Sequence, residues 1–145
     1  MAKKPPERID PEWAIREGAA ILRPLMSKHW FRFELCAKGG SSGGSFAAGE
    51  FRGWNRRLEF HFRYSLGLVR FHMGKASLSH EEYLRGLNVW GRNHYPGFTD
   101  DPLEPFRQLL SDLQEFGGDF LAGRRDHFMR LAAQAESSSQ DALDS

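Results

Sequence analysis

Residues 56–75, RRLEFHFRYSLGLVRFHMGK, alternate between apolar and polar side chains and predict an antiparallel β-hairpin. Alternation with a period of two places one set of side chains in a core and the other set on a polar face. The polar face is therefore where we expect a function to lie. The apolar set comprises Leu58, Phe60, Phe62, Tyr64, Leu66, Val69, Phe71 and Met73.

The pairing of the two strands depends on the turn between them. A turn centred on Leu66–Gly67 pairs Phe62 with Phe71, and aromatic pairs of this kind stabilise a sheet by about 0.2–1 kcal/mol. Like charges that face each other are unfavourable, so neighbouring carboxylates, a bound anion or solvent must offset such pairs on the polar face. This register predicts two of them: His61 opposite His72, and Arg63 opposite Arg70.

The charge balance bears on whether the chain binds nucleic acid, and the single cysteine bears on its cellular compartment. The 145 residues include 20 basic and 19 acidic side chains, and the net charge of +1 is too small to predict binding to nucleic acid. Cys36 has no second cysteine for an internal disulfide, which is typical of a reducing cytoplasm. The N-terminus lacks the apolar segment of a signal peptide, and no run of about 20 apolar residues predicts a membrane helix. We therefore expect a cytoplasmic protein that binds neither membrane nor nucleic acid.

The sequence predicts one folded unit between two polar ends. Residues 1–9 are rich in lysine and proline and predict a flexible segment, and residues 136–145, ESSSQDALDS, predict a disordered polar tail. Residues 10–135 contain no internal repeat and no linker, and a stretch of this length suffices for one domain.

Helix and strand signals over residues 10–135 predict an α+β domain. Asp10–Glu12 supplies an N-cap, a first-position proline and a first-turn acid, and Ser79–Glu82 has the Ser-x-x-Glu pattern of a capping box. Alternation predicts strands at residues 30–37 and 46–52 before the hairpin. The predicted order is α-ββββ-α-α, a four-stranded antiparallel meander sheet with helices packed on one face.

Four stretches of the chain resemble a known family. They read SSGGSFAAGEF, RRLEFHFRYSLGLVRFHMG, LSHEEYLRGL and YPGFTDDPLEPFRQLLSDLQEFGGDFL, and the likeness spans roughly residues 20–123. They resemble an uncharacterised family of small bacterial α+β proteins, and their layout is loosely similar to immunity-protein-like domains of bacterial toxin systems. The resemblance implies a toxin-neutralising role, but it includes no established catalytic motif and therefore implies no site residues.

The polar face of the predicted sheet carries the candidate site. A tight turn at residues 54–57 places Glu50 opposite His61, and His72 continues this row on the next strand. Arginine forks and imidazoles suit an anionic ligand or an acidic partner, whereas the alternative is a solvated face of salt-bridged neighbours. The candidate binding residues are Glu50, His61, Arg63, Arg70 and His72.

The sequence supports other kinds of site less well. A carboxylate and two histidines resemble a facial metal triad, but no H-x-H or H-E-x-x-H motif supports it, so we predict no metal and no cofactor. Cys36 shares the polar face and would become a nucleophile only if cations lowered its pKa. The glycine-rich segment 38–45 predicts a flexible loop, since it lacks the G-K-[ST] ending of a P-loop. His80, within the capping box, is expected to be exposed.

Two functions fit these observations. The first is a non-catalytic protein that binds a protein partner, or a second copy of itself, through the charged sheet face. The alternative is a protein that binds a small anionic ligand, or an enzyme, and that uses His61, His72 and Cys36 near the glycine-rich segment. A flat exposed face favours the first function, and a pocket on which the three side chains converge favours the second.

Overall fold

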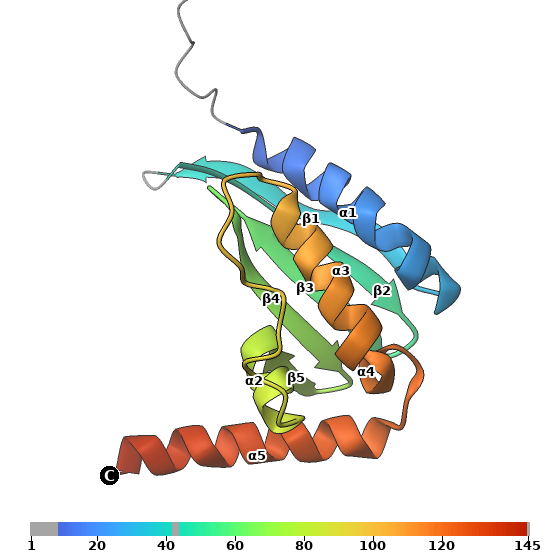
Figure 1. Ribbon diagram of the computed structural model, residues 1–145, viewed down its shortest axis with the longest axis vertical. Coiled ribbons are helices and arrows are strands. Elements are labelled where there is room, and N and C mark those ends of the chain that lie inside the picture. The colour runs from blue at the N-terminus through green and yellow to red at the C-terminus, as the bar shows by residue number, and fades with distance from the viewer. Residues whose placement is uncertain (1–8, 42–43, 145) are drawn as a thin grey trace, which may run out of the picture.

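A five-stranded antiparallel sheet in the order β1-β2-β3-β4-β5 forms the centre of the protein (Figure 1). This computed structural model describes residues 9–41 and 44–144. The strands are β1 Arg32–Ser41, β2 Gly44–Gly53, β3 Arg56–Phe62, β4 Leu66–Met73 and β5 Ala76–Ser79. The helices are α1 Pro11–Lys28, α2 His80–Gly86, α3 Glu104–Phe116, α4 Gly118–Ala122 and α5 Arg125–Asp144.

The α+β class and the antiparallel sheet are confirmed, but the sheet has five strands rather than the four predicted. The additional strand, β5, follows a tight turn that starts at Gly74, where φ is +60°. It contains four residues, and Leu78 is its one fully buried side chain. A strand this short shows too little alternation to be recognised from sequence.

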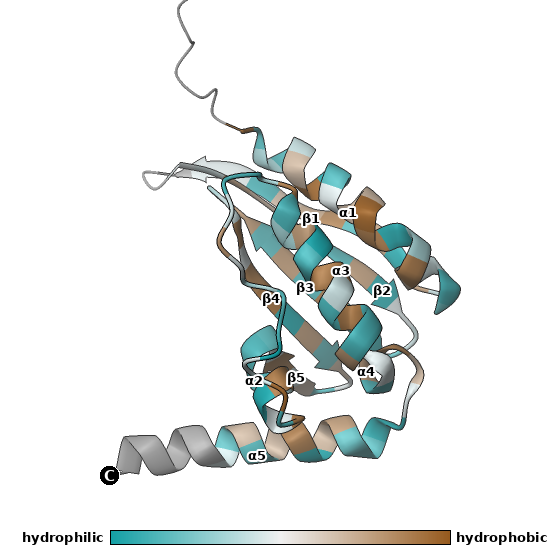
Figure 2. Cartoon of the chain, viewed as in Figure 1, coloured by the Kyte–Doolittle hydropathy of each residue, from teal (hydrophilic) through white to brown (hydrophobic). Residues whose placement is uncertain are grey.

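The core lies between the sheet and a layer of helices. Helices α1 and α3 cross one face of the sheet, and α5 runs beside β5 (Figure 1). Apolar and polar residues alternate along the central strands in the hydropathy colouring (Figure 2). Phe106 of α3 packs on Phe60 and Phe62 of β3, with ring centroids 6.0 and 6.5 Å apart. Gly18 of α1 permits this approach, because a Cβ there would lie 2.4 Å from the Phe106 ring.

The two faces of the β3–β4 hairpin are as predicted, whereas its register is not. Phe60 lies opposite Val69 rather than Met73, a shift of four residues, because the turn occupies residues 63–65. An even shift keeps each side chain on its face. The predicted apolar set is accordingly buried, except for Tyr64, which is 74% exposed in the turn.

The shifted register changes the predicted pairs on the polar face. His61 lies opposite Leu68 rather than His72, and Arg70 lies opposite Glu59 rather than Arg63. The predicted like-charged pairs are therefore wrong. A carboxylate opposite an arginine is a favourable cross-strand pair, and this pairing accompanies the observed register.

The turn between β2 and β3 lies one residue earlier than predicted. Trp54 and Asn55 alone form the loop, and Asn55 takes a left-handed conformation with φ of +59°, which asparagine tolerates. The prediction of a turn at residues 54–57 is therefore wrong. As a result Glu50 lies opposite Glu59 rather than His61.

The capping signals in the sequence are confirmed at two helix starts. The Asp10 carboxylate accepts a hydrogen bond from the Glu12 backbone N–H at 3.2 Å at the start of α1. Ser79 and Glu82 form the reciprocal capping box of α2, with contacts of 3.1 and 2.8 Å. These caps fix the residue at which each helix begins.

Two predicted polar segments differ from expectation. The glycine-rich segment continues β1 and β2 as far as Ser41 and Gly44, and its residues 42–43 lie outside the described residues. Helix α5 continues to Asp144, beyond the predicted start of the tail at residue 136. Residues 1–8 of the predicted flexible segment also lie outside the described ranges. No helix within the described part of the chain is both long and apolar enough to span a membrane.

Candidate functional site

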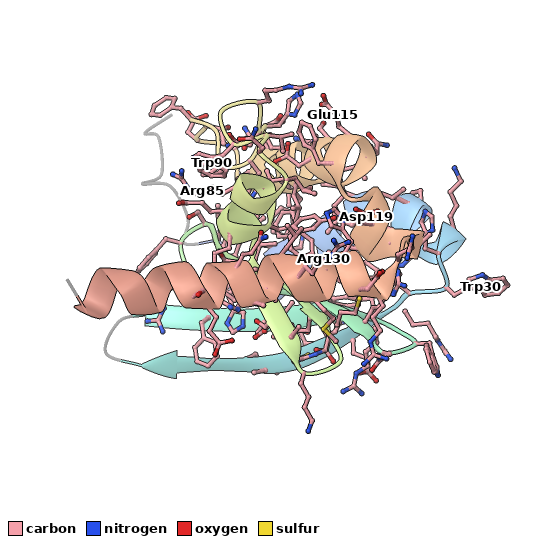
Figure 3. All side chains as sticks on the ribbon, turned by 90° about the horizontal axis from the view of Figure 1, so that it is seen from below. Trp30, Arg85, Trp90, Glu115, Asp119 and Arg130 are labelled. Carbon is pink, nitrogen blue, oxygen red and sulfur yellow. The ribbon has the colours of Figure 1, made fainter. Side chains whose placement is uncertain are left out.

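One face of the sheet points away from the helices, and we call it the open face. Figure 3 shows helices α1 to α4 on the opposite side of the sheet. Side chains of four strands form two parallel rows on the open face. The basic row is Arg32, Arg52, Arg57 and His72, and the acidic row is Glu34, Glu50 and Glu59 followed by Arg70.

Except for Glu59, which faces Arg70, the charges within each row face like charges, and the neighbouring row neutralises them. Glu50 forms an ion pair with Arg52 Nε at 3.0 Å and accepts a hydrogen bond from an Arg57 terminal nitrogen at 2.9 Å. Its side chain is only 5% exposed although no described helix covers this face. Arg52 also approaches Glu34 at 3.6 Å. The open face is thus connected by ion pairs along β2 and diagonally between neighbouring strands.

Glu59 holds both candidate histidines. Its two carboxylate oxygens lie 2.7 Å from His61 Nε2 and 2.7 Å from His72 Nε2. Burial alone would raise the pKa of Glu59, but the two imidazoles outweigh it, so the pKa of this carboxyl is lowered. The histidines therefore belong to one cluster, although they do not face each other across the strands.

The two candidate arginines lie in different places. Arg70 Nε donates to Ser77 Oγ at 3.0 Å, and a terminal nitrogen lies 3.7 Å from Glu82, so this side chain joins the open face to the start of α2. Arg63 lies in the β3–β4 turn, donates to the Gly44 carbonyl at 3.4 Å and stacks over Phe46 at 5.7 Å. The structure therefore gathers Glu50, His61, Arg70 and His72 on the open face and places Arg63 at its end.

Sequence reasoning missed the partners that organise this face. The predicted turn at residues 54–57 includes Arg57, which the structure places in β3, and Glu59 is absent from the predicted site although it lies opposite Glu50 and Arg70. For the β3–β4 pair, a search for the register that places carboxylates opposite arginines would favour the observed one, because it brings Glu59 opposite Arg70. The same search would fail for β2 and β3, where Glu50 lies opposite Glu59.

Cys36 lies in a β-bulge of β1, between Leu35 and Ala37. Burial raises the pKa of its thiol, and the carboxylates of Glu50 and Glu34 raise it further, while Arg57 acts in the opposite direction. A raised pKa disfavours the thiolate that nucleophilic catalysis requires. The charged neighbours of Cys36 are thus carboxylates and an arginine rather than the two histidines.

The metal interpretation can be compared with the geometry. Among residues 9–41 and 44–144, no group of three or more histidine, cysteine, aspartate or glutamate side chains could hold a metal ion. Glu50 points to two arginines, and each histidine binds a separate oxygen of Glu59.

No protein-family model, curated protein or solved structure matches this chain. The likeness to immunity-protein-like domains stays a prediction that depends on the quoted stretches.

A second polar cluster lies on the helical side. Asp112 of α3 is 2% exposed and accepts from the backbone N–H groups of His94 at 2.7 Å and Tyr95 at 2.9 Å. His80 Nε2 lies 3.0 Å from the same carboxylate, at an angle unfavourable for a hydrogen bond. Burial would raise the pKa of Asp112, but His80 and the two backbone groups outweigh it and lower this pKa. The prediction that His80 is exposed is wrong, since the residue is 4% exposed.

This cluster fixes a loop and borders a groove. The Tyr95 hydroxyl donates to the Leu66 carbonyl at 2.7 Å, so the loop after α2 is held against β4. The adjacent groove has a volume of about 430 Å³ and is lined in part by His80, Trp90 and Tyr95. Because Asp112 holds this loop through the backbone N–H groups of His94 and Tyr95, we assign its carboxylate a structural role.

Proposed function

We propose that this chain is a non-catalytic binding protein that recognises a protein partner through the open face. The observation that carries the proposal is the environment of Glu50, a carboxylate 5% exposed on a sheet face that no described helix covers. Two arginines hold it, and a neighbouring carboxylate holds two imidazoles. Such a surface is rigid before a partner arrives.

Rigidity favours recognition because little side-chain entropy is lost on binding. Long side chains that are already paired need not be ordered by the partner, and their charges fix its orientation. The same pairing disfavours catalysis by these carboxylates. A general base must be free to take a proton from a substrate, whereas Glu50 and Glu59 each already accept two contacts from this chain.

The identity of the partner is narrowed by the resemblance noted in the sequence. A toxin component bound by an immunity-like protein is one version of the proposal, and a second copy of the chain is another. Both versions use the same surface, so both predict that the same side chains determine affinity.

The experiment is an affinity capture from native cells, followed by reconstitution with the captured protein after purification. We compare the wild type with a His61→Ala/Arg70→Ala variant, since these side chains are 43% and 35% exposed and their loss leaves the core intact. Arg85→Ala is the matched control, because Arg85 is 58% exposed on α2 and lies on the helical side of the sheet (Figure 3). A partner lost only by the double variant supports the proposal, and equal capture by all three proteins refutes it.

A hollow at one end of the open face favours a second candidate, the binding of a small anion. It has a volume of about 230 Å³, and its lining includes Arg52, Arg56, Arg57 and His72. This volume is below the roughly 300 Å³ of ordinary ligand pockets, so an ion of the size of phosphate is the better fit. A thermal-shift titration with inorganic phosphate tests it, with Arg57→Ala as the variant that should abolish the shift.

A further inference from the structure

Two tryptophans at one end of the sheet are almost fully exposed. Trp30 is 87% exposed in the connection between α1 and β1, and Trp54 is 88% exposed in the β2–β3 turn. Each lies two residues along the chain from the facing pair Arg32 and Arg52, so both lie next to the basic row at this end of the sheet. Figure 3 shows Trp30 projecting away from the rest of the protein.

The backbone holds Trp30 outward in a conformation that glycine usually takes. The Trp30 N–H donates to the Ser27 carbonyl and the Phe31 N–H to the Met26 carbonyl, each at 3.1 Å, which is the Schellman pattern at the end of α1. Trp30 occupies the left-handed position of this motif with φ of +69°. A large side chain is disfavoured in this left-handed conformation, and the resulting backbone strain indicates that the indole has a function.

A groove lies beside the two tryptophans. Its volume is about 470 Å³, and its lining combines Phe31, Leu121 and Ala122 with Lys28, His29 and Arg56. None of the described residues that line it carries a carboxylate. Arg56 donates hydrogen bonds to the carbonyls of Phe120 and Gly123 at 2.8 Å, and Lys28, at the end of α1, is an exposed cation of the same lining.

We propose that Trp30 and Trp54 anchor an acidic protein partner, inserting into apolar recesses that carboxylates surround. The proposal rests on the proposed function, because it names where the partner of the open face is anchored. Tryptophan is the residue type most enriched among the few that dominate binding free energy at interfaces. Lys28 and Arg56 supply positive charge in a groove whose described lining has no carboxylate, and these charges would meet the partner's carboxylates.

The charge pattern favours a protein over a nucleic acid. Exposed tryptophans beside arginines also suit stacking on single-stranded bases. However, the three arginines of the basic row lie beside the three glutamates of the acidic row, and Glu50 already binds two of those arginines. A continuous positive track along a phosphate backbone is therefore missing from the open face.

The charge pattern also argues against a second copy as the occupant. A symmetric dimer whose two-fold axis passes through the groove would bring Lys28 and Arg56 of one copy near the same residues of the other. Like charges in a desolvated interface are unfavourable.

The test is photo-crosslinking of the full chain in native cells. The crosslinking residue p-benzoylphenylalanine replaces Trp30 or Trp54, and in control proteins it replaces Phe98, which is 106% exposed in a loop near α3. We expect one discrete protein adduct from positions 30 and 54 that position 98 does not give. No adduct, an adduct shared with position 98, an adduct of two copies of the chain, or an adduct removed by nuclease would each overturn the proposal.

The crosslinked protein is then identified, purified and titrated with variants. We expect Trp30→Ala/Trp54→Ala to weaken binding at least 30-fold and Phe98→Ala to leave it within threefold. Trp30→Gly suits the left-handed backbone and replaces Trp30→Ala if that variant is unstable. If His61→Ala/Arg70→Ala abolishes binding while the tryptophan variants do not change it, this inference fails and the proposed function stands. If the tryptophan variants abolish binding while His61→Ala/Arg70→Ala does not change it, the open face is not part of the interface and the tryptophans remain the anchor.

Discussion

Removal of the Glu50 carboxylate should destabilise the protein far more than removal of a neighbouring glutamate. Glu50→Ala deletes a charge-assisted hydrogen bond from Arg57 at 2.9 Å, worth about 1.5–3 kcal/mol, and an ion pair with Arg52 at 3.0 Å. Arg52 and Arg57 are 61% and 37% exposed, so water replaces part of each contact. We therefore expect a loss of about 2–4 kcal/mol in the free energy of unfolding, measured by urea denaturation with circular dichroism.

Glu34→Ala is the matched control for this prediction. Glu34 carries the same charge in the same row, but it is 57% exposed and lies 3.6 Å from Arg52. Its removal should cost less than about 0.5 kcal/mol, as for an exposed ion pair. Equal losses for the two variants, or a loss below about 1 kcal/mol for Glu50→Ala, would refute the reasoning that the open face is a preorganised network.

Three further predictions concern the core, the acid stability and the thiol. Phe62→Ala should lower the free energy of unfolding by about 3–5 kcal/mol, because the ring is 1% exposed and stacks on Phe106; a loss below 2 kcal/mol in urea denaturation would contradict its core position. The lowered pKa of Asp112 means that its carboxylate stabilises the fold above the ordinary aspartate range and that this contribution is lost as the pH falls through the folded-state pKa. Asp112→Asn should therefore unfold at lower urea concentrations at pH 7 and show a shallower acid dependence, and an unchanged dependence would exclude this assignment. Iodoacetamide should alkylate Cys36 more slowly than a free thiol at pH 8, and Glu50→Gln should speed the reaction, because Glu50 helps to raise this pKa; an unchanged rate would show that burial alone acts.

The alternation of residues 56–73 was sufficient to predict which side chains enter the core. Burial depends on the face, and the face depends only on whether a position is odd or even. The register was not predictable in the same way, since shifts of two or four residues preserve both faces. Short turns at residues 54–55 and 63–65 decide it, and those depend on Asn55 and on contacts from distant elements.

Alternation likewise predicts which candidate residues share a face, but not which of them touch. Glu50, His61 and His72 do lie on one polar face, but Glu59 and Arg57 connect them, and the observed register alone shows this. The burial of His80 was hidden from sequence because it depends on Asp112, which lies 32 residues further along the chain and belongs to another helix. Likewise, the proximity of Trp30 and Trp54 follows from the pairing of β1 with β2.

The dissociation constant of the captured, purified partner for wild type and for His61→Ala/Arg70→Ala tests the central claim most directly. Isothermal titration at pH 7 should show at least 30-fold weaker binding for the double variant, while Arg85→Ala stays within threefold of the wild type. An affinity of the double variant within threefold of the wild type would contradict the assignment of the open face as the binding surface.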